Sequence, residues 1–231
     1  MGWLMNISLN FISQGKGDDL ILLHGNGESC RYFSNQLEFF GKSRRVWAID
    51  TRGHGDSMRG TAPFTLSQFA DDLYRFMDEH GIEKADILGF SDGGNIAMLF
   101  ALRFPERVNR LILNGANLDT KGVRLWVQLP VEFGYKMAKK AAKKDQKALK
   151  NAEILSLMIN QPNISPAELA KLTMPVLVIA GTNDMIKRSH TELIYKSLPN
   201  ARLTLIKGDH FIAAKKPTEF NAAVKAFLEE E

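Results

Sequence analysis

Short, mostly apolar runs recur along this chain, and each ends at a glycine or a polar residue. They occupy residues 20–23, 46–49, 85–88, 108–113, 176–179 and 203–206. Continuous apolar runs of this length are typical of strands that are buried on both faces of a parallel sheet. Residues 7–12 differ, because they alternate apolar and polar side chains. That alternation predicts a further strand with one buried face.

Segments with helical periodicity lie between the apolar runs. Phe69, Leu73 and Phe76 recur on one face of residues 67–80, as in an amphipathic helix. Further helices are predicted at 95–104, 189–198 and 217–228. The alternation of strand and helix predicts an α/β fold with a doubly wound, mostly parallel sheet, and right-handed crossovers place helices on both of its faces.

Residues 116–172 interrupt this alternation, because they contain two helix-like stretches and no convincing strand. We interpret the segment as a small helical cap inserted within a single domain that spans residues 1–231. A lysine-rich stretch at 139–144 is flanked by alanine and apolar residues, which favours a solvated helix face over disorder.

Composition excludes several classes of protein. The single cysteine, Cys30, cannot form an intramolecular disulfide, and the net charge of +4 is too small to indicate a nucleic-acid partner. Neither a signal-peptide pattern nor an apolar run long enough to span a bilayer is present. Without an H-E-x-x-H motif or a Cys/His cluster, no metal and no cofactor are predicted. We expect a cytoplasmic protein that acts on a small molecule.

The motif Gly89-Phe90-Ser91-Asp92-Gly93-Gly94 is the sharpest chemical signal. It contains G-x-S-x-G directly after a predicted strand and before a predicted helix, which is the setting of a nucleophile elbow. In such an elbow a tight turn lifts the serine hydroxyl clear of the backbone. The alternative is a glycine-rich turn whose serine only caps a helix.

A second glycine-rich loop, His24-Gly25-Asn26-Gly27, follows an earlier strand. The N–H groups of Asn26 and Asp92 are predicted to hold a developing oxyanion. The same loop begins like a dinucleotide fingerprint, but Cys30 stands where the third glycine belongs, and the Gly-Lys-Ser/Thr of a P-loop is missing.

His210 follows the last apolar run and is the predicted base, with Asp184 as the acid that orients it. The chain order serine, acid, histidine supports this choice. Asp119 is the alternative acid. His54 is a less favoured candidate for the base because it precedes the serine in the chain. We expect the segment 50–57, which contains His54, to brace the loop at residues 24–27. His80 and His190 lie in helical stretches and are predicted to be solvated.

These motifs together resemble those of the α/β-hydrolase superfamily, in the family's order and over nearly the whole chain. They are His24-Gly25-Asn26-Gly27, the segment 50–57, Gly89-Phe90-Ser91-Asp92-Gly93-Gly94, Gly181-Thr182-Asn183-Asp184 and Gly208-Asp209-His210-Phe211. The elbow is similar to that of the valacyclovir-hydrolase and biphenyl-hydrolase-like branch. The region before Leu20 is short for the family's opening hairpin, so the first strand is expected to be abbreviated or missing.

The resemblance implies a serine hydrolase that cleaves a small carboxylic ester or related acyl compound through an acyl-enzyme on Ser91. Within the cap, Trp126, Leu129, Phe133 and Tyr135 are predicted to roof the substrate or to hold the cap on the body. Asp92 either interacts favourably with the helix dipole or, as the resemblance to the valacyclovir-hydrolase branch suggests, binds a substrate amino group.

Other activities remain open at this point. The same scaffold supports perhydrolysis, thioester cleavage and carbon–carbon bond hydrolysis, because a fold does not determine a reaction. Some relatives keep the triad but act as ligand sensors with slow turnover. The lysines of 136–150 also suggest a surface for anionic lipid or a protein partner, which is compatible with catalysis.

Overall fold

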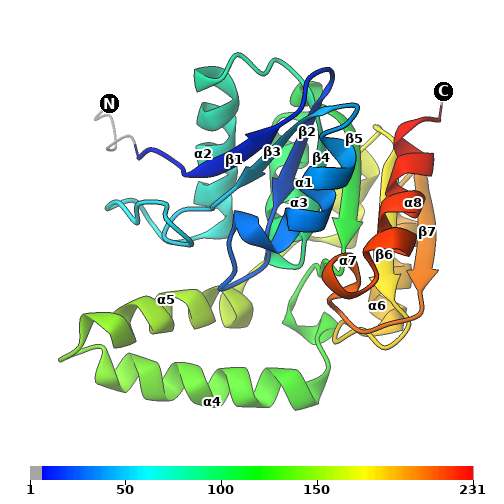
Figure 1. The fold of residues 1–231 in the computed structure, drawn as a ribbon. Helices are drawn as coiled ribbons and strands as arrows, with labels where there is room; N and C mark the ends of the chain where they lie inside the picture. Colours follow the sequence, from blue (N-terminus) through cyan, green and yellow to red (C-terminus); the bar gives the residue numbers. More distant parts are fainter. Residues whose placement is uncertain (1–6, 231) are drawn as a thin grey trace.

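A seven-stranded, mostly parallel sheet forms the centre of the computed structural model, which describes residues 7–230 (Figure 1). The strands are β1 (Phe11–Gln14), β2 (Asp19–Leu23), β3 (Arg45–Ile49), β4 (Ala85–Phe90), β5 (Val108–Asn114), β6 (Val176–Gly181) and β7 (Ala201–Ile206). Their order in the sheet is β1-β3-β2-β4-β5-β6-β7. Only β1 pairs antiparallel with its neighbour. The prediction of a doubly wound α/β fold is confirmed.

Helices cover both faces of the sheet. One face packs against α2 (Leu66–Glu79), α3 (Asp92–Arg103) and α6 (Arg188–Ser197). The other packs against α1 (Ser34–Phe40), α7 (Ile212–Lys215) and α8 (Pro217–Leu228). Short 3₁₀ helices span Cys30–Phe33, Pro105–Arg107, Thr120–Gly122 and Pro166–Lys171. The short α1 lacked a clear periodic pattern and was missed by the sequence analysis.

Burial on both faces explains why the strands are continuous apolar runs. In β2, Ile21 and Leu23 point into the core beneath α2 and α3, whereas Leu20 and Leu22 point into the core beneath α1 and α8. Successive side chains of a strand alternate between faces. A strand between two helical layers is therefore mostly apolar on both of its faces.

The predicted strand at residues 7–12 was wrong in its bounds, since β1 covers only Phe11–Gln14. Asn10 explains the difference. Its carbonyl accepts the Asp50 N–H at 2.9 Å, its own N–H donates to Ser57 Oγ at 2.8 Å, and its amide donates to Asp50 Oδ2 at 2.8 Å. These contacts fasten Asn10 to the loop after β3, and the regular ladder begins only at Phe11.

Two helices, α4 (Leu125–Ala141) and α5 (Gln146–Asn160), lie between β5 and β6 in the chain. They pack against each other beyond the carboxyl ends of the parallel strands, and α4 is the outer of the two (Figure 1). Asp145 caps α5 by accepting the Lys147 N–H at 2.8 Å. Within residues 7–230, no helix is long and apolar enough to cross a membrane.

Candidate active site

Ser91 occupies a sharp turn between β4 and α3. Its φ of 54° makes it the only non-glycine residue with positive φ in the described part of the chain. Its N–H donates to the Asn114 carbonyl at 2.8 Å, which fixes the turn to the end of β5. Such backbone strain persists only where surrounding structure enforces it, and it is concentrated at functional sites.

Two glycines of the motif make this turn sterically feasible. A Cβ on Gly93 would lie 2.0 Å from the Leu23 carbonyl oxygen, and one on Gly89 would lie 2.2 Å from the Gly93 carbonyl oxygen. Both obstacles are backbone atoms, which cannot swing aside. The glycines are therefore required by the close approach of α3 to β2 and β4.

His210 and Asp184 form a buried pair. His210 Nδ1 lies 2.6 Å from Asp184 Oδ1, and both side chains are almost fully buried. The same carboxylate oxygen accepts the Ile186 N–H at 2.9 Å, which holds Asp184 in its turn after β6. The alternative acid, Asp119, instead accepts the N–H groups of Lys121 and Gly122 and caps a 3₁₀ helix.

The imidazole of His210 lies at the same end of the sheet as Ser91. A Cβ on Gly115 would be 2.7 Å from His210 Cε1, so the ring rests against the residue that follows Asn114. The ring centroid is also 4.7 Å from that of Phe90, the neighbour of Ser91. Among the described residues, no hydrogen bond joins Ser91 Oγ to His210. Such contacts are often long in enzymes without substrate and tighten when substrate binds.

Asn26, Ser91 and Asp92 line one small cavity of about 20 Å³. The backbone N–H groups of Asn26 and Asp92 donate to no protein acceptor within residues 7–230. Asp92 is the first residue of α3, where N–H groups have no partner inside the helix. Donors of this kind beside a serine hydroxyl are the ingredients of an oxyanion hole.

The side chains of Asn26 and Asp92 are also joined. Asn26 Nδ2 donates to Asp92 Oδ2 at 2.8 Å, and Asn95 Nδ2 donates to Asp92 Oδ1 at 3.2 Å. Burial raises the pKa of the Asp92 carboxyl, and the two amides oppose that shift. The carboxylate is thus held beside the cavity by neutral donors rather than by a cation.

Glu28, in the loop after β2, is a titratable residue near the site that the sequence analysis did not single out. Its Oε2 accepts the Gly25 N–H at 3.3 Å. Burial raises the pKa of its carboxyl to about 7, against the opposing effect of the Gly25 hydrogen bond and of His210. Its position one residue beyond His24-Gly25-Asn26-Gly27 was the available signal, since that loop was already assigned to the site.

The remaining lining of the cavity comes from segments after β5 and β6 and from the end of α5. The residues are Asn117, Val123, Met158, Gln161, Met185 and Ile186. Trp126, Leu129 and Phe133, predicted to roof the substrate, are not among them. They lie on α4 and are strongly exposed, and Tyr135, half-buried on the same helix, does not line the cavity either.

Helix α5 is fastened to the body close to the cavity. Asn26 Nδ2 donates to the Ile154 carbonyl at 3.0 Å. Arg59 forms a bidentate ion pair with Glu153. Just beyond α5, Gln161 Oε1 accepts the Leu66 N–H at 2.9 Å. A cavity of about 20 Å³ holds roughly one water.

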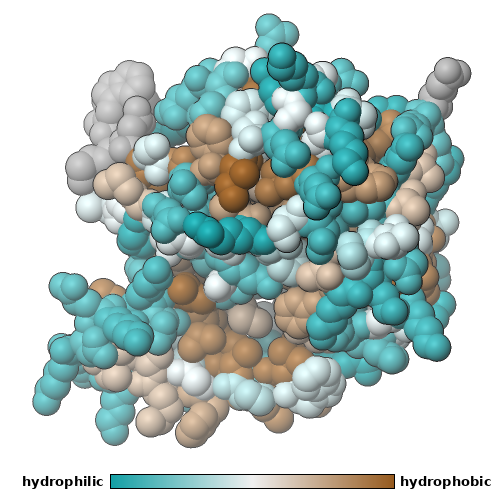
Figure 2. Space-filling model, viewed as in Figure 1, coloured by the Kyte–Doolittle hydropathy of each residue, from teal (hydrophilic) through white to brown (hydrophobic). Residues whose placement is uncertain are grey.

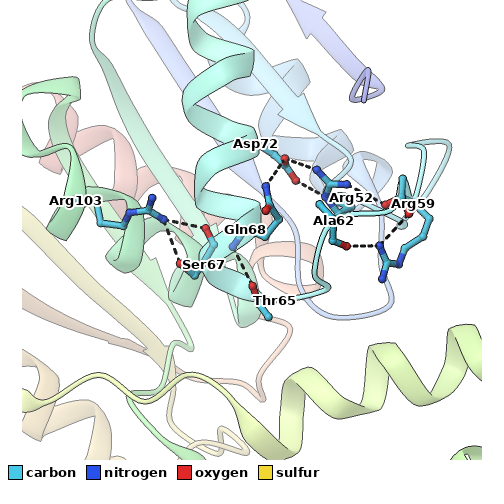
Figure 3. Close-up of polar contacts among 9 residues, drawn as sticks. Arg52, Arg59, Ala62, Thr65, Ser67, Gln68, Asp72 and Arg103 are labelled. Atoms are coloured by element: carbon cyan, nitrogen blue, oxygen red, sulfur yellow. Dashed lines mark hydrogen bonds and ion pairs between the residues drawn. The ribbon is translucent and has the colours of Figure 1, made fainter. Parts of the chain in front are cut away.

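The loop after β3 is braced by a buried ion pair (Figure 3). Arg52 Nε and one terminal nitrogen donate to the two oxygens of Asp72 on α2, at 2.7 and 2.6 Å. The other terminal nitrogen donates to the Arg59 carbonyl at 3.1 Å, and Gln68 Nε2 donates to Asp72 at 3.1 Å. This network holds the segment that presents Arg59 to α5.

Two histidines near this loop are buried and structural. His24 Nε2 accepts the Thr51 N–H at 3.0 Å, so its Nδ1 donates to the Gly25 carbonyl at 2.7 Å. Burial lowers the pKa of His24, and it lowers that of His54 to about 4. Both rings are therefore neutral at pH 7, and His24 links the loop after β2 to the loop after β3.

The prediction that His190 is solvated was wrong. His190 is buried, and its Nε2 accepts the Leu118 N–H at 2.9 Å. A Cβ on Gly122 would collide with the ring at 2.5 Å. His190 therefore ties α6 to the segment after β5, a role that helical periodicity alone does not reveal.

Cys30 is buried in the core beneath α1, and its N–H donates to Asp50 Oδ1 at 2.6 Å. Burial raises the pKa of its thiol to about 12, so the thiol stays protonated and packs as a small apolar group. Over residues 7–230, no group of three or more His, Cys, Asp or Glu side chains is arranged to hold a metal ion.

Comparisons with known proteins agree with the fold described above. The sequence model of the alpha/beta hydrolase fold family matches residues 19–153. A putative carbamate hydrolase RutD from Caulobacter sp. strain K31 is 28% identical, over 90% of each chain. The human serine hydrolase BPHL is 27% identical, over 96% of this chain and 84% of its own.

A solved structure shares the fold over nearly its full length. The enol-lactonase from Burkholderia xenovorans LB400 superimposes with a TM-score of 0.82, covers 97% of each chain and is 21% identical. The named relatives support hydrolase activity for this chain. With a family match across more than half of its length and the sheet, elbow and chain order just described, the protein belongs to the alpha/beta hydrolase fold family.

Proposed function

We propose that this protein is a serine hydrolase that cleaves a small carboxylic ester or a related acyl compound. Ser91 is the nucleophile, His210 the general base and Asp184 the acid that orients it. The observation that carries the proposal is the strained Ser91 turn at the carboxyl end of β4. At the same end of the parallel strands, His210 Nδ1 lies 2.6 Å from Asp184 Oδ1. A hydroxyl, an imidazole and a carboxylate in this order are the components of nucleophilic acyl transfer.

The proposed reaction has two halves. Neutral His210 takes the Ser91 proton at Nε2 while Oγ attacks the substrate carbonyl, and the N–H groups of Asn26 and Asp92 stabilise the oxyanion. His210 then gives that proton to the leaving group, which departs as an alcohol. A water attacks the acyl-enzyme with His210 again as base, and the released acid and free Ser91 close the cycle.

Asp184 accepts from Nδ1 throughout, which leaves Nε2 as the nitrogen that acts as base toward Ser91. Asp184 also stabilises the imidazolium that forms in each half-reaction. Replacing it with asparagine would favour the wrong tautomer, and no proton needs to move onto Asp184 itself.

We also propose a specificity role for Asp92. Its carboxylate lines the cavity and is held only by the amides of Asn26 and Asn95. A substrate ammonium would compensate the buried negative charge better than a neutral amide does. An aminoacyl ester should then have a higher kcat/KM than its des-amino analogue, and equal values would remove this role.

We further propose that α4 and α5 form a small cap within one domain, and that α5 opens to admit substrate. The support is the small size of the cavity and the contacts of Asn26 with Ile154 and of Arg59 with Glu153. In the closed position Asn26 would connect the cap with the oxyanion loop, because one side-chain amide contacts both Asp92 and α5.

The decisive experiment uses a panel of short p-nitrophenyl esters. Ser91→Ala should retain its far-UV circular dichroism and lose turnover by several orders of magnitude. Ser189→Ala removes an exposed hydroxyl from α6 and should leave turnover unchanged. Near-normal turnover in Ser91→Ala would refute the mechanism. A single turnover followed by arrest in the unsubstituted protein would favour the alternative, a ligand sensor that keeps a hydrolase triad.

A further inference from the structure

The outer helix α4 exposes a row of large apolar side chains. The exposed fractions are 67% for Leu125, 67% for Trp126, 59% for Leu129, 67% for Phe133 and 55% for Met137. At 3.6 residues per turn, these five side chains fall within about 120° of the helix circumference. We call this set the apolar face. It points away from α5, since Gly134 on the other side of α4 approaches Leu155 of α5.

A basic segment overlaps the last turn of the apolar face and continues beyond it. Residues 136–150 contain seven lysines and a single acidic residue, Asp145, so this segment alone carries a formal charge of +6. The rest of the chain is then slightly acidic, because the whole carries +4. We call residues 136–150, at the turn between α4 and α5, the basic tip.

Within residues 7–230, no ion pair compensates the lysines of the basic tip. The carboxylate of Asp145 is occupied in capping α5. Figure 2 shows the combination on one side of the molecule, with brown residues gathered toward α4 and teal ones at the end where α4 meets α5.

Lys136 and Lys140 fall within the same sector of α4 as the apolar face. A surface that contacts this face would therefore meet apolar side chains, including an indole, along one part of the helix and ammonium groups along the next. That arrangement is typical of helices that lie in the interface of a lipid bilayer, with Trp, Phe and Leu inserted and lysines at the headgroups. Exposed apolar patches of this kind mark interaction sites.

We propose that α4 docks on an anionic lipid surface through its apolar face, with the basic tip contacting the phosphate groups of the lipids. Charge complementarity selects this occupant. Anionic headgroups attract lysines placed near a membrane surface, and acyl chains accept the side chains that α4 leaves in water. A nucleic acid would use the lysines but not the apolar row.

Docking would bring the cap toward the lipid. Helix α5 lies between α4 and the body and also contributes Met158 to the cavity. Docking on lipid does not depend on the proposed reaction at Ser91. None of the proposed catalytic residues, Ser91, His210 and Asp184, belongs to the apolar face or the basic tip.

Co-sedimentation of the full chain with vesicles tests the proposal. Vesicles of phosphatidylcholine mixed with phosphatidylglycerol should bind the protein, and pure phosphatidylcholine should bind it much less. Added salt should weaken the binding, since it screens charges at the membrane surface. Trp126 provides a reporter, because its emission should shift to the blue on vesicles and this shift should be missing in Trp126→Phe.

Variants separate the two parts of the surface. Lys139→Gln/Lys140→Gln should reduce partitioning about thirtyfold, at roughly 1 kcal/mol for each lysine. Lys196→Gln/Lys207→Gln makes the same change in charge at exposed positions outside the basic tip and should have little effect. Trp126→Ser/Phe133→Ser should reduce partitioning about a hundredfold from the loss of buried apolar area.

A matched apolar control is Leu193→Ser, which removes an exposed leucine from α6. Far-UV circular dichroism and the thermal midpoint of each variant verify that the fold is retained. No binding to anionic vesicles, or binding that neither double variant weakens, would overturn the proposal. So would a dimer in solution that Trp126→Ser/Phe133→Ser dissociates while vesicle binding is missing, because the apolar face would then serve a second copy of this chain.

Discussion

Breaking the buried ion pair between Arg52 and Asp72 should destabilise the fold far more than breaking any surface pair. The side chains are 1% and 3% exposed, and two N–O contacts at 2.6 and 2.7 Å join them. Asp72→Ala leaves the guanidinium buried without a counter-ion. Removal of one partner from such a pair costs about 3 to 5 kcal/mol.

The second half of this prediction concerns both partners together. Arg52→Met/Asp72→Leu removes the two charges and keeps much of the volume, a change that is often neutral in buried sites. The double variant should therefore recover most of the stability lost in Asp72→Ala. It gives up the contact of Arg52 with the Arg59 carbonyl (Figure 3), so full recovery is not expected.

Urea unfolding followed by circular dichroism measures these differences. A loss of 3 to 5 kcal/mol corresponds to a fall in the thermal midpoint of roughly 10 °C for a chain of this size. Arg188→Ala, which breaks the exposed pair with Glu192, serves as control and should change stability by less than about 1 kcal/mol. A loss below about 1 kcal/mol in Asp72→Ala, or a double variant no more stable than Asp72→Ala, would refute the reasoning.

Two further predictions concern the same region. Burial lowers the pKa of His54 from 6.5 to about 4. Between these two values, the imidazole binds a proton in the unfolded chain but not in the folded chain. The free energy of unfolding therefore falls as the pH drops from 6.5 toward 4. This group should account for about 2 kcal/mol of the stability lost between pH 8 and pH 5. His54→Gln should show a correspondingly shallower pH dependence in urea unfolding, and an unchanged slope would contradict the assignment. Glu153→Gln should loosen α5 with little loss of global stability, because its pair with Arg59 is about one-third exposed. Amide hydrogen exchange should become faster in α5 and stay the same in α8, whereas unchanged exchange in α5 would show that the pair does not restrain the cap.

The strands of the sheet and the chain order of the candidate site residues could be predicted from the sequence alone. Apolar runs at β2 and β6 are continuous because both of their faces are buried, and this property is visible without coordinates. The glycines flanking Ser91 were equally readable, since a strand that turns sharply into a packed helix excludes side chains at Gly89 and Gly93. Local sequence carries such information because each requirement acts on neighbours in the chain.

Contacts between groups far apart in the chain could not be predicted in this way. Asp119 and Asp184 both follow strands and are alike in sequence, but only Asp184 faces His210, because Asp119 is used by the turn in which it sits. The burial of His190 likewise depends on a contact between segments far apart in the chain. The exposure of α4 is a further case, since its apolar pattern is equally compatible with a roof over substrate, and only the packing of α5 against the body left that face in water. These outcomes depend on three-dimensional competition for the same space, which a one-dimensional pattern does not encode.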